Sequence, residues 1–348
     1  MPEGEAPELP DSLPRESMAR SRVLDRLDAL YALGDKIGYS EQEDSAHALA
    51  RGWMEDAGLT VEVDEAGNLI GRSGVDDDLW TGSHLDSVPG GGKYDGMLGV
   101  VAGLEAVDRN RRGAVVAFRD EERGCAGSRA RAASGKLPRR YVELHIEQGP
   151  VLLEAEQPLA VVTGITGLAR GEIETHGQAG HAGTMPMAGR SDALVAAAEL
   201  ILHICDTASE IDGAVATVGR LVVEPGAPNV IPERVVVSVD ARAPDPERLQ
   251  ELIDALGLEP TYRVEPVAMS DAVRRVLHEA IVARGLPPIR LASGAGHDAG
   301  ILAAAGVECG MLFVRSQNGG VSHHADELTS DEDVDVAVEV LADALAQL

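Results

Sequence analysis

The sequence is poor in aromatic residues and in lysine, and it has no long apolar segment. Phe, Trp and Tyr make up 3% of the 348 residues, so the core has to be built mainly from Ala, Val, Leu and Ile, within a hydrophobic content of 44%. No run of about 18 apolar residues occurs, which excludes a membrane-spanning helix. The length suffices for one large domain or two smaller ones.

Positive charge is also scarce. Thirty Lys and Arg residues face 58 Asp and Glu residues, which gives a formal net charge of −28 at pH 7. Binding to nucleic acid needs a basic surface that neutralises phosphates, so the charge argues against a nucleic-acid partner. It also disfavours an anionic membrane surface.

Cysteine is rare as well, and no leader segment is apparent. Cys125, Cys205 and Cys309 are odd in number and far apart, which argues against a disulfide framework and for a reducing, cytoplasmic location. Residues 1–17 are acidic and rich in Pro, without the apolar stretch of a signal peptide. We expect them to form a flexible tail.

The patterns predict two domains. Helical and strand patterns alternate in residues 1–163 and 269–348, which predicts an α/β catalytic domain with a mixed sheet flanked by helices. Residues 164–268 follow the order β-α-β-β-α-β, which is typical of a ferredoxin-like α+β domain inserted into the first. In the first domain, polar clusters follow predicted strands at 79–84, 114–118 and 141–147, and sites in α/β sheets form at the carboxyl ends of strands.

The stretch HLDSVPGGGKYDG, which starts at His84, carries candidate metal ligands. Imidazole and carboxylate suit zinc, manganese, cobalt or nickel, and His84 with Asp95 could hold such ions. Asp86 could hydrogen-bond the imidazole of His84 and orient it. The alternative for Asp95 is a helix N-cap, because a helix is predicted from Gly96.

Three adjacent carboxylates, Asp120, Glu121 and Glu122, follow the apolar strand at 114–118. They repel each other unless cations lie nearby, so they favour a metal site. On a turn, one glutamate can bind metal while the other accepts a proton from water. The alternative is an acidic loop tip in a very acidic protein. Cys125, close by, has no histidine pattern for a nucleophile and is interpreted as a small buried residue.

Eight motifs carry a resemblance to a known family. They are GSHLDSVPGGGKYDGMLGV, DEE, ELHIEQGP, GQAGHAGTMPM, NVIP, VDAR, SGAGHDA and SHHADE, in this order. The chain resembles the hydantoinase/carbamoylase amidases, which lie within the superfamily of dinuclear aminoacylase/dipeptidase metallopeptidases. The resemblance runs from about residue 20 to the C-terminus. Two stretches, 123–144 and 245–270, are shorter than is usual in that family.

The resemblance implies a role for each motif residue. His84 and His145 would bind one metal ion, Glu122 and His323 the second, and Asp95 would bridge the two. Glu121 would be the general base, assisted by Asp86 and His181. The substrate would contact Gln148, His181, Asn229, Arg242 and His297. Residues 164–268 would act as a lid and form a homodimer, with some lid groups reaching the partner's site.

Physical chemistry supports several of these roles. The planar guanidinium of Arg242, at the end of an alternating strand, suits a substrate carboxylate, although the pattern alone favours a salt bridge with Asp240. His181 lies in a loop without apolar periodicity and could donate to an oxyanion. Small residues around His297 let a ligand approach closely.

The resemblance therefore implies a hydrolase that cleaves the ureido C–N bond of N-carbamoyl-L-amino acids. A hydroxide bridging the two metal ions would attack the carbonyl carbon, with Glu121 as the base. Allantoate amidohydrolase and β-ureidopropionase use the same groups and stay open as alternatives. A dipeptidase or aminoacylase is a third possibility, and a metal-dependent binding protein without turnover is a fourth.

Overall fold

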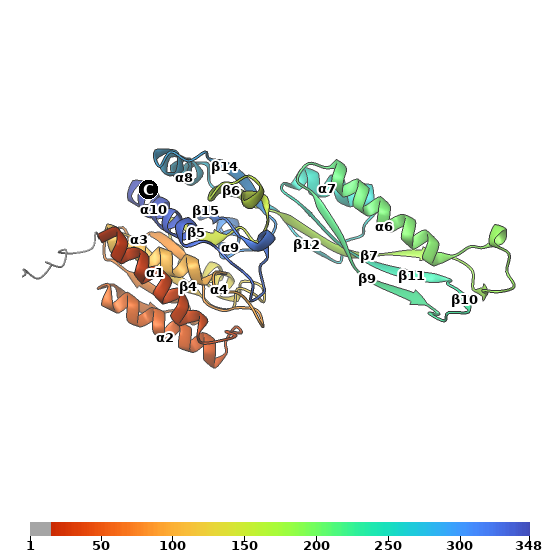
Figure 1. Cartoon of the computed structure of the whole chain (residues 1–348), viewed down its shortest axis with the longest axis horizontal. Coiled ribbons are helices and arrows are strands. Elements are labelled where there is room, and N and C mark those ends of the chain that lie inside the picture. The colour runs from red at the N-terminus through yellow and green to blue at the C-terminus, as the bar shows by residue number, and fades with distance from the viewer. Residues whose placement is uncertain (1–14) are drawn as a thin grey trace, which may run out of the picture. The chain divides into compact units, whose positions relative to one another are not determined.

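The computed structural model describes residues 15–348 (Figure 1). They form two compact units. Unit 1 comprises the described residues up to Val161, together with Ser270–Arg290 and His297–Leu348, and unit 2 comprises Val162–Met269 and Leu291–Gly296. Of the expected flexible tail, residues 1–14 lie outside the described part of the chain, and residues 15–17 belong to the first helix.

Unit 1 is a mixed sheet flanked by helices, so the predicted α/β class is confirmed. Its helices are α1 (Arg15–Tyr31), α2 (Glu41–Asp56), α3 (Met97–Asn110), α4 (Ala126–Ser134), α5 (Val151–Glu154), α8 (Asp271–Ala283), α9 (Asp298–Ala304) and α10 (Asp331–Gln347). Its strands are β1 (Thr60–Val63), β2 (Leu69–Arg72), β3 (Leu79–His84), β4 (Ala114–Phe118), β5 (Arg140–Ile146) and β15 (Glu308–Val314), and β6 (Leu159–Ile165) and β14 (Ile289–Ser293) continue into unit 2. The strand order is β1-β2-β4-β3-β5-β15-β6, with β14 paired to β6.

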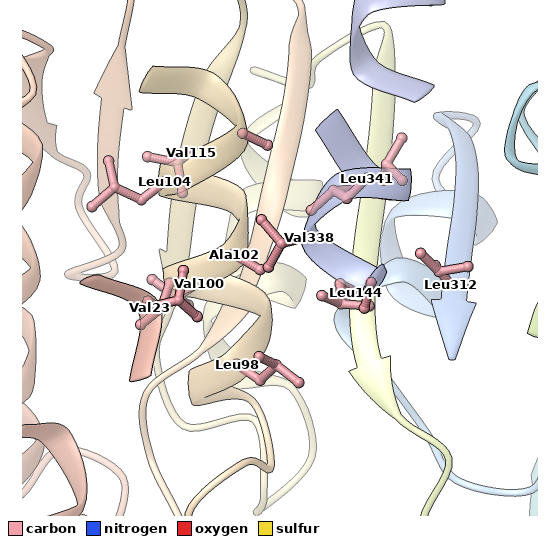
Figure 2. Packing of buried hydrophobic residues seen from close by; sticks show 14 of the residues in the cluster. Val23, Leu98, Val100, Ala102, Leu104, Val115, Leu144, Leu312, Val338 and Leu341 are labelled. Atoms are coloured by element: carbon pink, nitrogen blue, oxygen red, sulfur yellow. The ribbon is translucent and has the colours of Figure 1, made fainter. Parts of the chain in front are cut away.

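The central strands β4, β3, β5 and β15 run parallel. Helices cover both of their faces, so a continuous apolar strand such as AVVAF in β4 is buried throughout. On one face, α3 and α10 pack together over the sheet. Figure 2 shows Leu98 and Leu104 of α3 with Val338 and Leu341 of α10, all in one buried cluster. This packing fixes the sheet from which the polar loops emerge.

The parallel strands carry three predicted polar clusters to the same edge of the sheet. The register places His84, the last residue of β3, opposite Phe118, the last residue of β4. In β5, Leu144 and Ile146 join the cluster beneath α3, while His145 points to the opposite face because side chains alternate along a strand. Because β3 lies between β4 and β5, the turn that follows Phe118 and the loop that follows Ile146 begin on either side of His84.

Unit 2 contains a four-stranded antiparallel sheet of order β12-β7-β11-β9. Its elements are β7 (Gly167–His176), β8 (Gly180–His181), η1 (Met187–Gly189), α6 (Ala193–Glu210), β9 (Val215–Glu224), β10 (Val230–Ile231), β11 (Arg234–Ala243), α7 (Pro246–Leu256), β12 (Tyr262–Val264) and β13 (Val267–Ala268). Ignoring the short β8 and β10 pair, the order is β-α-β-β-α-β. Both helices pack on one face of this sheet, over Val239 and Ala241.

No helix in the described part of the chain has both the length and the apolar character needed to cross a bilayer.

Leu341→Ala tests how far unit 1 depends on the packing between α3 and α10. Leu341 is fully buried, so truncating it leaves a cavity, and we expect the free energy of unfolding to fall by about 2–5 kcal/mol. Val75→Ala is the control, because Val75 is 55% exposed and should change stability by less than about 0.5 kcal/mol. Urea denaturation measures both. Equal effects of the two variants would contradict this account of the core.

Candidate metal centre

His84 ends β3 and is almost completely buried. Its Nδ1 lies 3.2 Å from Oδ1 of Asp86, as expected of an orienting carboxylate, and its Nε2 lies 3.5 Å from Oδ1 of Asp95. Gly96 packs against the ring so closely that a Cβ built there would lie 2.4 Å from it. The φ of +65° at Gly96 also suits glycine. The ring is therefore held on two sides.

Asp95 lies between three imidazoles. Its Oδ1 is 3.5 Å from Nε2 of His84 and 3.1 Å from Nε2 of His145, and its Oδ2 is 3.4 Å from Nε2 of His323. The alternative of a helix N-cap is wrong, because α3 begins at Met97 with Gly96 as its N-cap and no side-chain cap. The two oxygens of one carboxylate thus face two groups of ligands.

Several polar groups hold Asp95 in this orientation. Gln148 Nε2 donates to its Oδ2 at 2.8 Å, and the Ser322 hydroxyl donates to the same oxygen at 3.2 Å. Oε1 of Glu327 accepts from the backbone N–H groups of Tyr94 and Asp95 at 2.8 and 3.0 Å. Gln148 therefore lies within the centre. No role was assigned to Glu327 from the sequence, although it is the last residue of the SHHADE motif.

The turn after β4 directs the carboxylates of Glu121 and Glu122 towards different neighbours. Asp86 accepts from the backbone N–H groups of Glu121 and Glu122 at 3.0 and 3.1 Å. Oε2 of Glu122 lies 3.3 Å from Nε2 of His323, whereas Oε2 of Glu121 lies 3.8 Å from Nε2 of His84. The carboxylates are thus part of the centre and not an exposed loop tip. Cys125 is buried, as interpreted from the sequence.

The charges in the centre are strongly coupled. Burial alone would raise the pKa of Asp95, but the neighbouring imidazoles of His145, His323 and His84 outweigh it and hold that pKa well below its usual range. Burial would likewise lower the pKa of His145, yet Asp95 raises it to about 9. Burial raises the pKa of Glu121 well above its usual range. The imidazoles and carboxylates therefore neutralise one another.

The donor set fits two cations that share Asp95. Ligand atoms of His84, Asp95 and His145 lie within 4.8 Å of one another, and so do those of Asp95, Glu122 and His323. Nε2 of His84 and Oε1 of Glu122 are buried and have no hydrogen-bond partner among the described residues. Buried polar atoms without partners are costly, and a bound cation would satisfy them.

His297 joins the centre at one side. Its ring centroid lies 4.4 Å from that of His145, and burial lowers its pKa well below the usual range. Glu143 completes a third group of ligand atoms with these two histidines. However, one oxygen of Glu143 accepts from Ser83 Oγ at 2.7 Å and the other from Ala299 N at 2.9 Å. Both oxygens of Glu143 therefore accept hydrogen bonds from the protein. The sequence signal for its position was the alternation along β5, which places Glu143 on the same face as His145.

Asp298 is a second buried carboxyl that the sequence prediction did not assign. It follows His297 in the SGAGHDA motif and is completely buried. Burial raises its pKa to about 8, and the neighbouring Glu143 carboxylate adds to the effect. Burial beside Glu143 therefore favours the neutral form of this carboxyl.

The remaining predicted residues lie in unit 2, at two different ends of its sheet. Ala182 N donates to the backbone oxygen of Asn229 at 3.0 Å, so His181 and Asn229 are close neighbours on the β8–β10 pair. Arg242 lies on β11 opposite Leu168, at the other end of the strand from Arg234 and His176.

Arg242 forms the salt bridge that its pattern favoured. Its Nε lies 2.8 Å from Oδ1 of Asp240, and its Nη1 donates to the backbone oxygen of Gly294 at 2.6 Å. Asp240 also pairs with Arg170 at 2.7 Å. These groups line a cavity of about 880 Å³ within unit 2. Glu172 lines the same cavity, so its two guanidinium groups are matched by two carboxylates.

Comparisons with known proteins agree with this geometry. Residues 80–347 match the model of peptidase family M20/M25/M40. The chain belongs to this family. It is 38% identical to an N-carbamoyl-L-amino acid amidohydrolase of Geobacillus stearothermophilus (90% of this chain, 93% of that protein). It is 30% identical to an allantoate amidohydrolase of Bacillus subtilis (90% and 92%).

A solved structure gives the same result. A hydantoinase/carbamoylase family amidase from Burkholderia phymatum is 30% identical, with a TM-score of 0.85 over 94% of this chain and 97% of that one. The resemblance found in the motifs is therefore confirmed. The family is metal-dependent, and the candidate ligand groups around Asp95 agree with this.

Gly96→Ala tests the link between the loop and His84. The added Cβ cannot share space with the imidazole, so we expect the ring to move and the affinity for manganese to fall by about 10-fold or more. Gly90→Ala is the matched control, because Gly90 has a φ of +67° but nothing within 4 Å of a built Cβ. Both variants should lose some thermal stability. Manganese titration should separate them, and equal affinities would contradict the assigned position of His84.

Proposed function

We propose that this chain hydrolyses the ureido C–N bond of an N-carbamoyl-L-amino acid. The observation that carries the proposal is a buried carboxylate, Glu121, which lies beside the two candidate ligand groups but belongs to neither. A metal-dependent amidohydrolase needs such a group to accept a proton. Three relatives, 33–38% identical over 88–90% of this chain, are named as amidohydrolases of N-carbamoyl-L-amino acids.

Two divalent ions would be held at Asp95. His84 and His145 would hold the first and Glu122 and His323 the second, and the ligand types suit zinc, manganese, cobalt or nickel. Such ions lower the pKa of a bound water and polarise a carbonyl. Asp86 would keep the His84 ring in place through its contact with Nδ1.

Glu121 would move the proton. Its carboxylate accepts a proton from the attacking water, and the oxygen of that water forms a bond to the ureido carbonyl carbon. When the C–N bond breaks, Glu121 gives the proton to the leaving nitrogen. The products are the free amino acid and carbamic acid, which decomposes to carbon dioxide and ammonia. Gln148 and His297 line the centre and would contact the ureido group.

The positions of the proposed substrate-binding residues in unit 2 support a homodimer. Arg234 lies opposite His176, and Arg242 lies eight residues further along β11, a span of about 26 Å at 3.3 Å per residue. His181 follows β7 beyond His176. A small substrate therefore cannot contact Arg242 and His181 of the same chain.

We infer that each site combines two chains. Arg242 of one chain would bind the substrate carboxylate, with Asn229 and His181 of the partner subunit contacting the same substrate and His181 donating to the carbonyl oxygen. An exposed sheet edge supports association of unit 2. Strand β9 is the last strand of its sheet and exposes Val215, Leu221 and Val222, and exposed edges favour pairing with a second copy. Unit 2 would thus serve as both lid and dimerisation domain.

The cysteines favour a cytoplasmic location. Cys125, Cys205 and Cys309 are all free, as expected in a reducing compartment.

Allantoate is the second candidate substrate, because the relative from Bacillus subtilis is named for it and covers 90% of this chain. Allantoate also carries ureido groups next to a carboxylate. The same residues would serve both reactions, so the choice depends on the groups that contact the rest of the substrate.

Ammonia release decides between these substrates. We expect manganese-loaded protein to release ammonia from one member of a panel of N-carbamoyl-L-amino acids, β-ureidopropionate and allantoate. Glu121→Gln should lose at least about 10²-fold in kcat, because the amide cannot accept the proton. It should still bind two manganese ions per chain, because Glu121 is outside both ligand groups.

No turnover across the panel, with two ions bound, would overturn the ureidohydrolase assignment. Dipeptides and acylated amino acids would then be tested. Failure of those as well would leave a metal-dependent binding protein.

Mixing two inactive variants tests the shared site. Glu121→Gln and His181→Ala should each be inactive or nearly so. In a heterodimer, one site would combine an intact Glu121 with an intact His181 from the other chain. After exchange of subunits, an equimolar mixture should therefore recover roughly a quarter of wild-type activity. Sedimentation confirms that dimers form. A mixture as inactive as its components would show that His181 acts within its own chain or not at all.

A further inference from the structure

The turn that carries Glu121 and Glu122 is held by side chains from distant parts of unit 1. Four consecutive backbone N–H groups, at residues 119–122, each donate to a side-chain oxygen. The acceptors are Asn68 Oδ1 at 3.0 Å, Glu43 Oε1 at 3.0 Å, and Asp86 Oδ1 and Oδ2 at 3.0 and 3.1 Å. Asp86 belongs to the centre described above, whereas Glu43 lies on α2 and bonds to the turn through Asp120 N and Arg119.

The conformation of this turn depends on its surroundings. Asp120 has a φ of +52°, which an L-residue adopts at an energetic cost. The Asp120 N–H is bound by Glu43, and its carboxylate pairs with Arg123 at 2.7 Å. Gly38 lies against it so closely that a Cβ built there would be 1.8 Å from Asp120 Oδ1. These contacts keep the residue before Glu121 in a conformation that it would otherwise leave.

Glu43 is a completely buried carboxylate, and two of its partners belong to this turn, while Nε2 of His47 lies further from it at 3.9 Å. Besides binding Asp120 N, its Oε2 lies 2.7 Å from Nη2 of Arg119 and accepts from the backbone N–H of Tyr39. A buried ion pair of this kind contributes little net stability, so its presence is better explained by the geometry that it imposes. Without the carboxylate, the Arg119 guanidinium and the Asp120 N–H would both lose a buried partner.

We propose that Glu43 is a positioning residue, which fixes the turn at residues 119–122 and thereby sets the positions of the Glu121 and Glu122 carboxylates. This rests on the proposed function of those two residues as base and metal ligand. Glu43 itself contacts neither substrate nor metal. Its effect passes through one hydrogen bond to Asp120 and one ion pair to Arg119.

Glu43→Gln is the main test. The side-chain amide has one acceptor oxygen in place of two, so it cannot satisfy both Asp120 N and Arg119. We expect kcat for the ureido substrate to fall about 10–100-fold with KM nearly unchanged, and the affinity for the second manganese ion to fall by a similar factor. Manganese titration followed by metal analysis measures the affinity without any substrate.

Glu105→Gln is the matched control. Glu105 is also a completely buried carboxylate, and it pairs with Arg22 at 2.8 Å and Arg109 at 3.0 Å on α3, away from the turn. The Glu105→Gln variant should lose thermal stability, as Glu43→Gln does, but keep the wild-type kcat and both metal affinities. Asp44→Asn is a second control, because it removes an exposed partner of Arg119 and leaves Glu43 in place.

The strain at Asp120 allows a rescue experiment. Glycine adopts a positive φ without cost, so the double variant E43Q/D120G should regain part of the metal affinity that Glu43→Gln loses. If Glu43→Gln does not fold, Glu43→Asp replaces it. The shorter carboxylate keeps the charge opposite Arg119 but cannot also reach Asp120 N, so the same losses are expected.

Wild-type kcat and metal affinity in a folded Glu43 variant would overturn the proposal and leave Glu43 as a residue of the core. Loss of stability alone, matching Glu105→Gln, would do the same. If the wild-type protein turns over no ureido substrate, the metal titrations still decide the question, so failure of the proposed function and failure of this proposal remain distinguishable.

Discussion

The candidate site depends on one buried carboxylate, Asp95, placed between three imidazoles. A charge removed from water needs partners within the protein, and Asp95 has them on both oxygens: His84 and His145 on one, His323 on the other. The same arrangement separates the ligands into two groups that share one residue. A single carboxylate therefore sets both the charge balance of the site and the position where two cations could lie side by side.

The protein holds its functional loops with carboxylates that accept from backbone N–H groups. Asp86 binds the amides of Glu121 and Glu122, Glu327 binds those of Tyr94 and Asp95, and Glu43 binds that of Asp120. Each accepting carboxylate lies far from its amide in the sequence, so each hydrogen bond joins two separate parts of the chain. In a chain with so many acidic residues, a subset of them is thus used inside the fold, where charge-assisted hydrogen bonds are strong.

Much of the site followed from the sequence because its residues lie where parallel strands end. The strand at Ala114–Phe118 has the predicted bounds, and the alternation in β5 separated His145 from the apolar core. Glu43 could not be found in this way. In the sequence, Glu43 is one of several acidic residues on a helix. Only tertiary packing shows that it is buried against a turn whose Asp120 lies 77 positions away.

The separation of Arg242 from His181 could not be predicted from the sequence, for a different reason. The strand pattern gives the length of β11, but the motifs NVIP and VDAR say nothing about the register between β11 and β7. Only the pairing of Arg234 with His176 shows that the strand runs away from His181 towards Arg242. His181 and Asn229 lie close together, whereas Arg242 lies at the far end of β11, which is compatible with the expectation that some lid groups reach the partner's site.

The two adjacent glutamates differ because of where the turn directs them. Asp86 binds both of their amides, so the backbone gives each residue the same support. Glu122 extends to His323 and enters a ligand group with Asp95, whereas Glu121 stays with His84, buried beside Cys125, and enters none. A carboxylate bound to a cation is a poor base, since the cation withdraws its electron density. We propose that the residue excluded from the ligand groups, Glu121, is the one that carries the proton, and its exclusion is a property of the turn rather than of the side chain.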